Sequence, residues 1–86
     1  MSGRAEMLPP PPEVPLVQAA PCRPHEVVEV RGGHGMRRHL TDMGFVPGAV
    51  ISVVGSHGGT CIVRVLDTRL MLGRGMAQRI IVRPLR

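Results

Sequence analysis

The sequence predicts a mainly β fold, a small curled barrel of about five short strands with one short helix. Two observations support this. Five short segments rich in β-branched residues alternate apolar and polar side chains and are separated by turn residues. One helical repeat lies between the first and second of these segments. A closed or curled arrangement also hides strand edges that would otherwise pair with other chains.

Two regions are expected along the 86 residues. Residues 1–15 contain four consecutive prolines, lack the apolar pattern of a packed element and should be an extended or disordered tail. The P-x-x-P spacing from Pro12 to Pro15 fits a groove-binding ligand, but a solubilising tail is the favoured interpretation. Residues 16–86 form the single domain that a chain of this length can build.

The predicted strands take their faces from period-two alternation. In the first, Val28 and Val30 point one way, and Glu29 and Arg31 point the other. In the third, Cys61 and its alternate neighbours should be buried, because Arg64 lies on the opposite face. A single helical turn at 74–78 leads into the last strand. The five predicted strands are Glu26–Arg31, Ala49–Val54, Cys61–Leu66, Arg69–Leu72 and Arg79–Val82.

The helix and the corner after it are the most informative part of the chain. Met36, Leu40 and Met43 recur at the i, i+4, i+7 spacing of one helix face. Gly44 then stands where a helix end takes positive φ. Pro47-Gly48 suits the centre of a type II turn, which redirects the chain into the next strand.

Charge and cysteine content restrict the function classes. All 11 basic residues are arginine, which against 6 acids gives a formal net charge of +5 and favours acidic partners. Cys22 and Cys61 lie far apart in a sequence without a signal-peptide pattern or an apolar run of membrane-spanning length. We therefore expect a reduced, cytoplasmic protein.

No enzymatic or cofactor site is expected. No Ser, Thr or Cys has a base and an orienting group around it in a recognised pattern, and the glycines lack the spacing and the lysine of a phosphate loop. Cys22-x-x-His25 has the spacing of half a metal site, but a lone pair of ligands closes no tetrahedral shell. We therefore expect no catalytic residues, no metal ligands and no cofactor.

The string R-x-L-x-x-M-G-x-x-P-G-x-x-I, from Arg38 to Ile51, resembles the FeoA family of ferrous iron transport accessory proteins. Leu70-Met71-Leu72-Gly73 and the segment 77–82 extend the resemblance, which covers residues 16–84. It implies an SH3-like barrel. It also implies a cytosolic partner of FeoB, the GTP-hydrolysing membrane transporter of Fe(II), with membrane contact through that partner only.

The helix and corner are the expected contact surface, because charged and apolar groups stand together there on a rigid element. The residues expected to contact the partner are Arg37, Arg38, Asp42, Met43 and Phe45, and the turn residues that shape the corner are Gly44, Pro47 and Gly48. Met43 and Phe45 could instead fill the core.

Three alternatives stay open. A small basic barrel could bind nucleic acid, although Phe45 is the chain's one aromatic residue and single-strand binding normally uses several as stacking platforms. The second alternative is a free-standing metal-responsive domain related to those of iron-dependent transcription regulators. Open sheet edges also allow a weak homo-oligomer.

Overall fold

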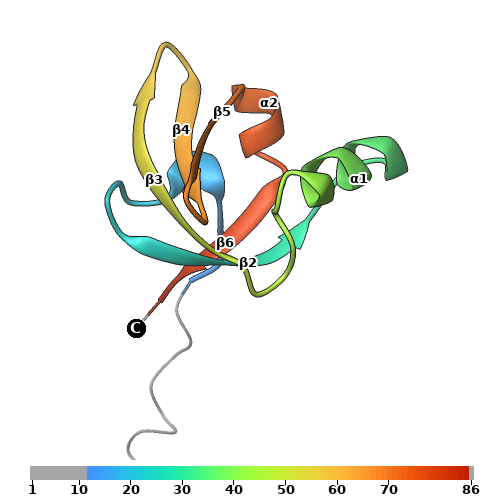
Figure 1. The fold of residues 1–86 in the computed structure, drawn as a ribbon, viewed down its shortest axis with the longest axis horizontal. Helices are drawn as coiled ribbons and strands as arrows, with labels where there is room; N and C mark the ends of the chain where they lie inside the picture. Colours follow the sequence, from blue (N-terminus) through green and yellow to red (C-terminus); the bar gives the residue numbers. More distant parts are fainter. Residues whose placement is uncertain (1–11, 86) are drawn as a thin grey trace, which may run out of the picture.

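The computed structural model describes residues 12–85, which form one antiparallel sheet of six strands together with two helices and a short 3-10 turn (Figure 1). The strand order is β1-β6-β2-β3-β4-β5. The elements in chain order are β1 (Val14–Pro15), η2 (Leu16–Gln18), β2 (Pro24–Val30), α1 (His34–Asp42), β3 (Val50–His57), β4 (Thr60–Val65), β5 (Thr68–Leu72), α2 (Arg74–Ala77) and β6 (Ile80–Pro84).

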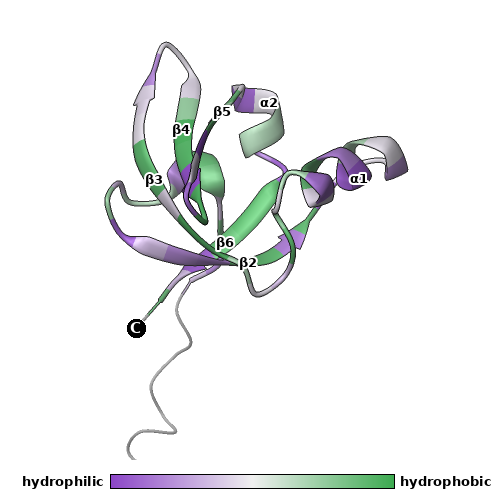
Figure 2. Cartoon of the chain, in the orientation of Figure 1, coloured by the Kyte–Doolittle hydropathy of each residue, from purple (hydrophilic) through white to green (hydrophobic). Residues whose placement is uncertain are grey.

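The sheet curls around its own core. The β3–β4 hairpin stands across the direction of β2 and β6, and α1 extends to one side of the sheet (Figure 1). Hydrophobic residues colour much of β3, β4 and β6, whereas α1 is mostly hydrophilic (Figure 2). This arrangement confirms the predicted mainly β class with one short helix, and adds a sixth strand. No helix within residues 12–85 is long and apolar enough to cross a bilayer.

The sixth strand lies in the segment expected to be tail. Val14 and Pro15 form β1, which pairs antiparallel with Val82 and Ile81 of β6, and Leu16 directly after it is buried. The sheet therefore includes Val14 and Pro15, two residues that were expected to belong to the tail. The tail predicted for residues 1–11 lies outside the described residues.

The buried face of β2 differs from the prediction. His25 and Val27 are buried, while Val28 is only half-buried. The register between β2 and β6 shifts between Val27 and Glu29, so Val28 occupies a β-bulge. The bulge reverses the phase of the alternation, which returns Val30 to the side that packs against the core. The prediction that Val28 and Val30 share a face was wrong because it assumed an unbroken period of two.

The helix ends in a corner with two glycines of positive φ. Leu40 of α1 is fully buried at 0% exposure, with Met36 and Met43 packed beside it. Gly44 follows at φ +108° and Gly48 at φ +92°. The amide of Ala49 donates to the carbonyl of Val46 at 2.9 Å, which closes a turn with Pro47-Gly48 at its centre.

The expected alternation holds in β4 but not in β6, where Ile80, Ile81 and Val82 are all buried. Cys61, Val63 and Val65 of β4 are buried and Arg64 between them is exposed. The pKa of the Cys61 thiol is raised by its burial away from water. The single turn expected at 74–78 is α2, whose Ala77 enters the core.

Candidate functional site

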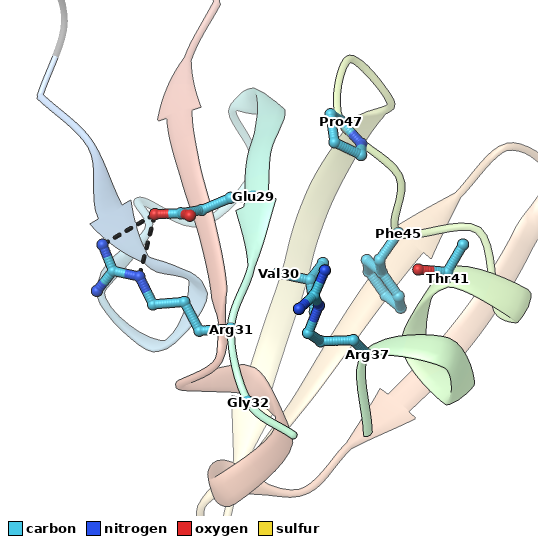
Figure 3. A pocket seen from close by; sticks show the side chains of 8 residues that line it. All are labelled: Glu29, Val30, Arg31, Gly32, Arg37, Thr41, Phe45 and Pro47. Atoms are coloured by element: carbon cyan, nitrogen blue, oxygen red, sulfur yellow. Dashed lines mark hydrogen bonds and ion pairs between the residues drawn. The ribbon is translucent and has the colours of Figure 1, made fainter. Parts of the chain in front are cut away.

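A shallow groove of about 440 Å³ opens between the end of β2, the side of α1 and the corner that follows α1 (Figure 3). The end of β2 lies beside α1 because only Arg31, Gly32 and Gly33 connect Val30 to the first residue of α1. The residues that line the groove are Glu29, Val30, Arg31, Gly32, Arg37, Thr41, Phe45 and Pro47.

One wall of the groove comes from α1 and the corner. Arg37 and Thr41 are four residues apart, so they project from the same side of the helix. Phe45 forms the floor and is 0% exposed. Its amide donates to the Leu40 carbonyl at 3.1 Å, which ties the corner to the last turn of α1. The wall is therefore held by backbone hydrogen bonds and by a buried ring.

The opposite wall comes from the end of β2. The Arg31 guanidinium forms an ion pair with the Glu29 carboxylate at 2.9 Å. Both side chains are exposed, so water screens this pair and it adds little stability. Figure 3 shows the pair directed away from Arg37, with Val30 on the strand side of the groove. Glu29 therefore does not neutralise Arg37.

A second, smaller hollow of about 290 Å³ lies along α1 and is lined by His34, Arg37, Arg38 and Thr41. Arg37 and Arg38 are exposed, and neither forms an ion pair with another residue of the described chain. Arg37 lines both hollows, so this side of α1 presents uncompensated positive charge next to the groove. Such a surface can receive an acidic group together with an apolar one.

The structure brings together only part of the predicted contact set. Arg37 and Phe45 meet in the groove, and Arg38 lines the smaller hollow. Asp42 is exposed but lines neither hollow, and Met43 is half-buried against the core. Phe45 acts as a core residue whose ring the groove reaches, rather than as a protruding contact.

The strand side of the groove was not predicted from the sequence. Glu29 and Val30 were expected only as strand residues and Pro47 only as a turn residue, and Thr41 was not expected in the contact surface. The Gly32-Gly33 connection was the available signal, because so short a link keeps the end of a strand beside the start of the next helix.

The two residues of the Cys22-x-x-His25 pair have different environments in the described structure. His25 is buried, and its Nδ1 donates to the Arg23 carbonyl at 2.8 Å. Cys22 is exposed and has φ +64°. Residues 12–85 contain no group of three or more His, Cys, Asp and Glu side chains that could hold a metal ion.

Known protein structures share this fold. A crystal structure of an iron uptake regulatory protein (FeoA) is 40% identical, with a TM-score of 0.79, over 86% of this chain and 99% of that chain. The FeoA of Stenotrophomonas maltophilia, solved with zinc and described as an SH3 domain protein and candidate ferrous iron transport activating factor, is 27% identical with a TM-score of 0.70. The match covers 78% of this chain and 86% of that one.

More distant proteins share the fold alone. A manganese-dependent transcriptional repressor is 22% identical with a TM-score of 0.79, over 96% of this chain and 48% of the repressor. Comparison with curated protein sequences finds no match. The model of the FeoA domain family matches residues 14–84, which begin at the first residue of β1 and end at the last residue of β6. The chain therefore belongs to the FeoA family and has its SH3-like fold.

Proposed function

We propose that this protein is an accessory protein of Fe(II) uptake that binds the cytoplasmic part of a FeoB-type transporter through α1 and the adjacent groove. Two kinds of support exist for the uptake role. The chain belongs to the FeoA family, and a 27% identical relative is described as a candidate ferrous iron transport activating factor.

The observation that supports this docking site is that two arginines without ion-pair partners lie beside a preformed groove. Arg37 and Arg38 have no carboxylate partner among residues 12–85, and the groove beside them includes the apolar groups of Val30 and Pro47. An acidic side chain of the transporter would meet Arg37 while a neighbouring apolar side chain enters the groove. Charge complementarity of this type speeds encounter and selects the partner.

The rigidity of this surface favours binding without rearrangement. The Phe45 ring is buried, and the Phe45 amide is bonded to the last turn of α1. A preformed surface loses less conformational freedom on binding than a loop does. The surface therefore suits a regulatory contact that forms and breaks during transport.

The test is co-purification of the full-length protein with FeoB extracted in detergent. Arg37→Glu with Arg38→Glu should weaken the complex by about tenfold or more, since both charges would then repel the acidic partner. The same pair of substitutions should leave the fold intact, because exposed changes alter stability by only about 0.5 kcal/mol. Fe(II) uptake by cells carrying the variant should fall with it.

A matched control is available on another part of the surface. Arg64 and Arg69 are exposed, change the net charge by the same amount when reversed, and line neither hollow of the candidate site. Arg64→Glu with Arg69→Glu should leave co-purification in detergent unchanged. A folded α1 variant that retains wild-type co-purification would refute the docking site.

A further inference from the structure

A second unusual surface lies on the outer side of the β4–β5 hairpin. Cys61, Val63 and Val65 of β4 turn inward, so the residues between them face outward, as do the alternate residues of β5. Cross-strand pairing aligns Ile62 with Met71 and Arg64 with Arg69. The outer face, called here the hairpin face, consists of Ile62, Arg64, Leu66, Arg69 and Met71.

Leu66 is the most exposed large hydrophobic residue of the described chain, at 84%. Together with Asp67 it forms the two-residue turn between the paired residues Val65 and Thr68. Its backbone has φ +57°, a conformation that glycine, asparagine or aspartate adopts more readily than leucine. The fold therefore holds an apolar side chain in water, at a hairpin tip, on a strained backbone.

Met71 adds a second protruding apolar side chain, 72% exposed, on the strand that forms one edge of the sheet. Met71 lies two residues from Arg69 on the same face of β5, and Leu66 lies in the adjoining turn, two residues after Arg64. Exposed apolar groups beside basic ones are typical of surfaces that contact a membrane.

Arg64 and Arg69 lie directly opposite one another, and like charges in such a cross-strand pair repel. Neither forms an ion pair with any carboxylate of residues 12–85. Asp67, the nearby carboxylate at the hairpin tip, likewise forms no ion pair within that range. An anion held between the two guanidinium groups would relieve the repulsion and accept hydrogen bonds from both.

The shape of the hairpin face favours a bilayer over a protein as its partner. None of its residues lines the groove or the hollow along α1. A protein partner needs matching sockets for protruding side chains, whereas the interface of a fluid bilayer adapts to them. Leucine and methionine can enter below the headgroups while arginine binds the phosphates.

We propose that the hairpin face binds the surface of an anionic phospholipid bilayer. Leu66 and Met71 enter the interface, and Arg64 and Arg69 contact headgroup phosphates. This contact is separate from the α1 surface proposed for FeoB, and it departs from the expectation that the protein reaches the membrane only through its partner. It would hold the domain beside a membrane transporter and so raise the local concentration of the domain near the transporter.

The test is flotation of the full-length protein with vesicles of equal parts phosphatidylglycerol and phosphatidylcholine, compared with phosphatidylcholine alone. Binding should require the anionic lipid and should weaken as salt rises. Arg64→Gln with Arg69→Gln should lower the partition coefficient about 30-fold, from about 1 kcal/mol for each arginine near the surface. Asp67→Asn should raise the coefficient by several-fold, because it removes the one carboxylate at the tip.

Leu66→Asn separates the apolar contribution from the charge. Asparagine tolerates positive φ, so the variant should melt at or above the wild-type temperature while vesicle binding falls by about tenfold. The control for charge is Arg37→Gln with Arg38→Gln, which alters the net charge equally on α1 and should lower binding by less than about fivefold.

Three results would overturn the proposal. The first is absence of flotation at millimolar anionic lipid in low salt, and the second is an equal loss in the α1 control and the hairpin variant. The third is loss of detergent co-purification with FeoB in the hairpin variants together with unchanged vesicle binding, which would assign the face to the protein partner. The α1 docking site is tested by co-purification with FeoB in detergent, where no bilayer is present. Either proposal can therefore be refuted without the other.

Discussion

Gly44→Ala should destabilise the protein strongly, because both the backbone and the packing at this position require glycine. A Cβ atom there would lie 3.0 Å from Cγ1 of Val65, and the residue has φ +108°. The backbone conformation alone costs an alanine about 1–2 kcal/mol. Crowding of the buried Val65 adds about 1–3 kcal/mol, as in other overpacked cores.

The sum, about 2–5 kcal/mol, is comparable with the whole stability of about 3–5 kcal/mol that a single small core provides. For a domain of this size each kcal/mol shifts the melting temperature by about 4–8 °C. Thermal unfolding followed by circular dichroism should therefore show a decrease of at least about 8 °C, or a chain that is already unfolded at room temperature.

Two other glycines separate the contributions. Gly48 has φ +92° but no atom within 4 Å of an added Cβ, so Gly48→Ala should lose only the backbone part. Gly35 lies in α1 with the same open space and no positive φ, so Gly35→Ala should raise the melting temperature by a few degrees. The expected order of stability is Gly35→Ala, wild type, Gly48→Ala, Gly44→Ala. A Gly44→Ala protein as stable as the wild type would refute the close packing of the corner against β4.

Two further predictions address the core. Leu40→Ala should lower the free energy of unfolding by about 2–5 kcal/mol, because Leu40 is fully buried. Thr41→Ala on the exposed side of α1 should change it by no more than about 0.5 kcal/mol. Chemical denaturation measures both values, and equal losses would contradict the burial of Leu40. Burial raises the pKa of the Cys61 thiol in the folded state, so the unfolded chain releases that proton first and stability should fall as pH rises above about 8.5. The chain has no lysine or tyrosine to titrate in this range. Melting curves at pH 7 and pH 10 should show this decrease in the wild type and in Cys22→Ala, and a pH dependence that persists unchanged in Cys61→Ala would exclude the thiol as its source.

Local patterns explain the elements that could be predicted from the sequence. The helix face around Leu40 follows a period set by the helix itself, and the corner follows from the backbone freedom of glycine and the fixed φ of proline. The alternation in β4 likewise needs no knowledge of the neighbouring strands. Each of these features depends on residues only a few positions apart.

Features that depend on distant segments could not be predicted in this way. Val14 and Pro15 become a strand only because β6, almost seventy residues later, offers them a partner. The bulge at Val28 arises from the register between β2 and β6, so no period within β2 reveals it. The strand side of the candidate groove has the same origin, since Val30 gains its role only when α1 folds beside it.

Leu66 shows why the hairpin face was also missed. In the sequence it continues the outward alternation of β4 and looks like an ordinary strand residue before a turn. Only the backbone reveals that leucine occupies a position of positive φ, and only the solvent exposure reveals that nothing in residues 12–85 covers it. A strained backbone or an exposed side chain at Leu66 would not by itself indicate a binding surface. Leu66 has both features and lies near two opposed arginines without ion-pair partners, which indicates a partner outside the domain. An anionic bilayer can bind the apolar and the charged side chains together.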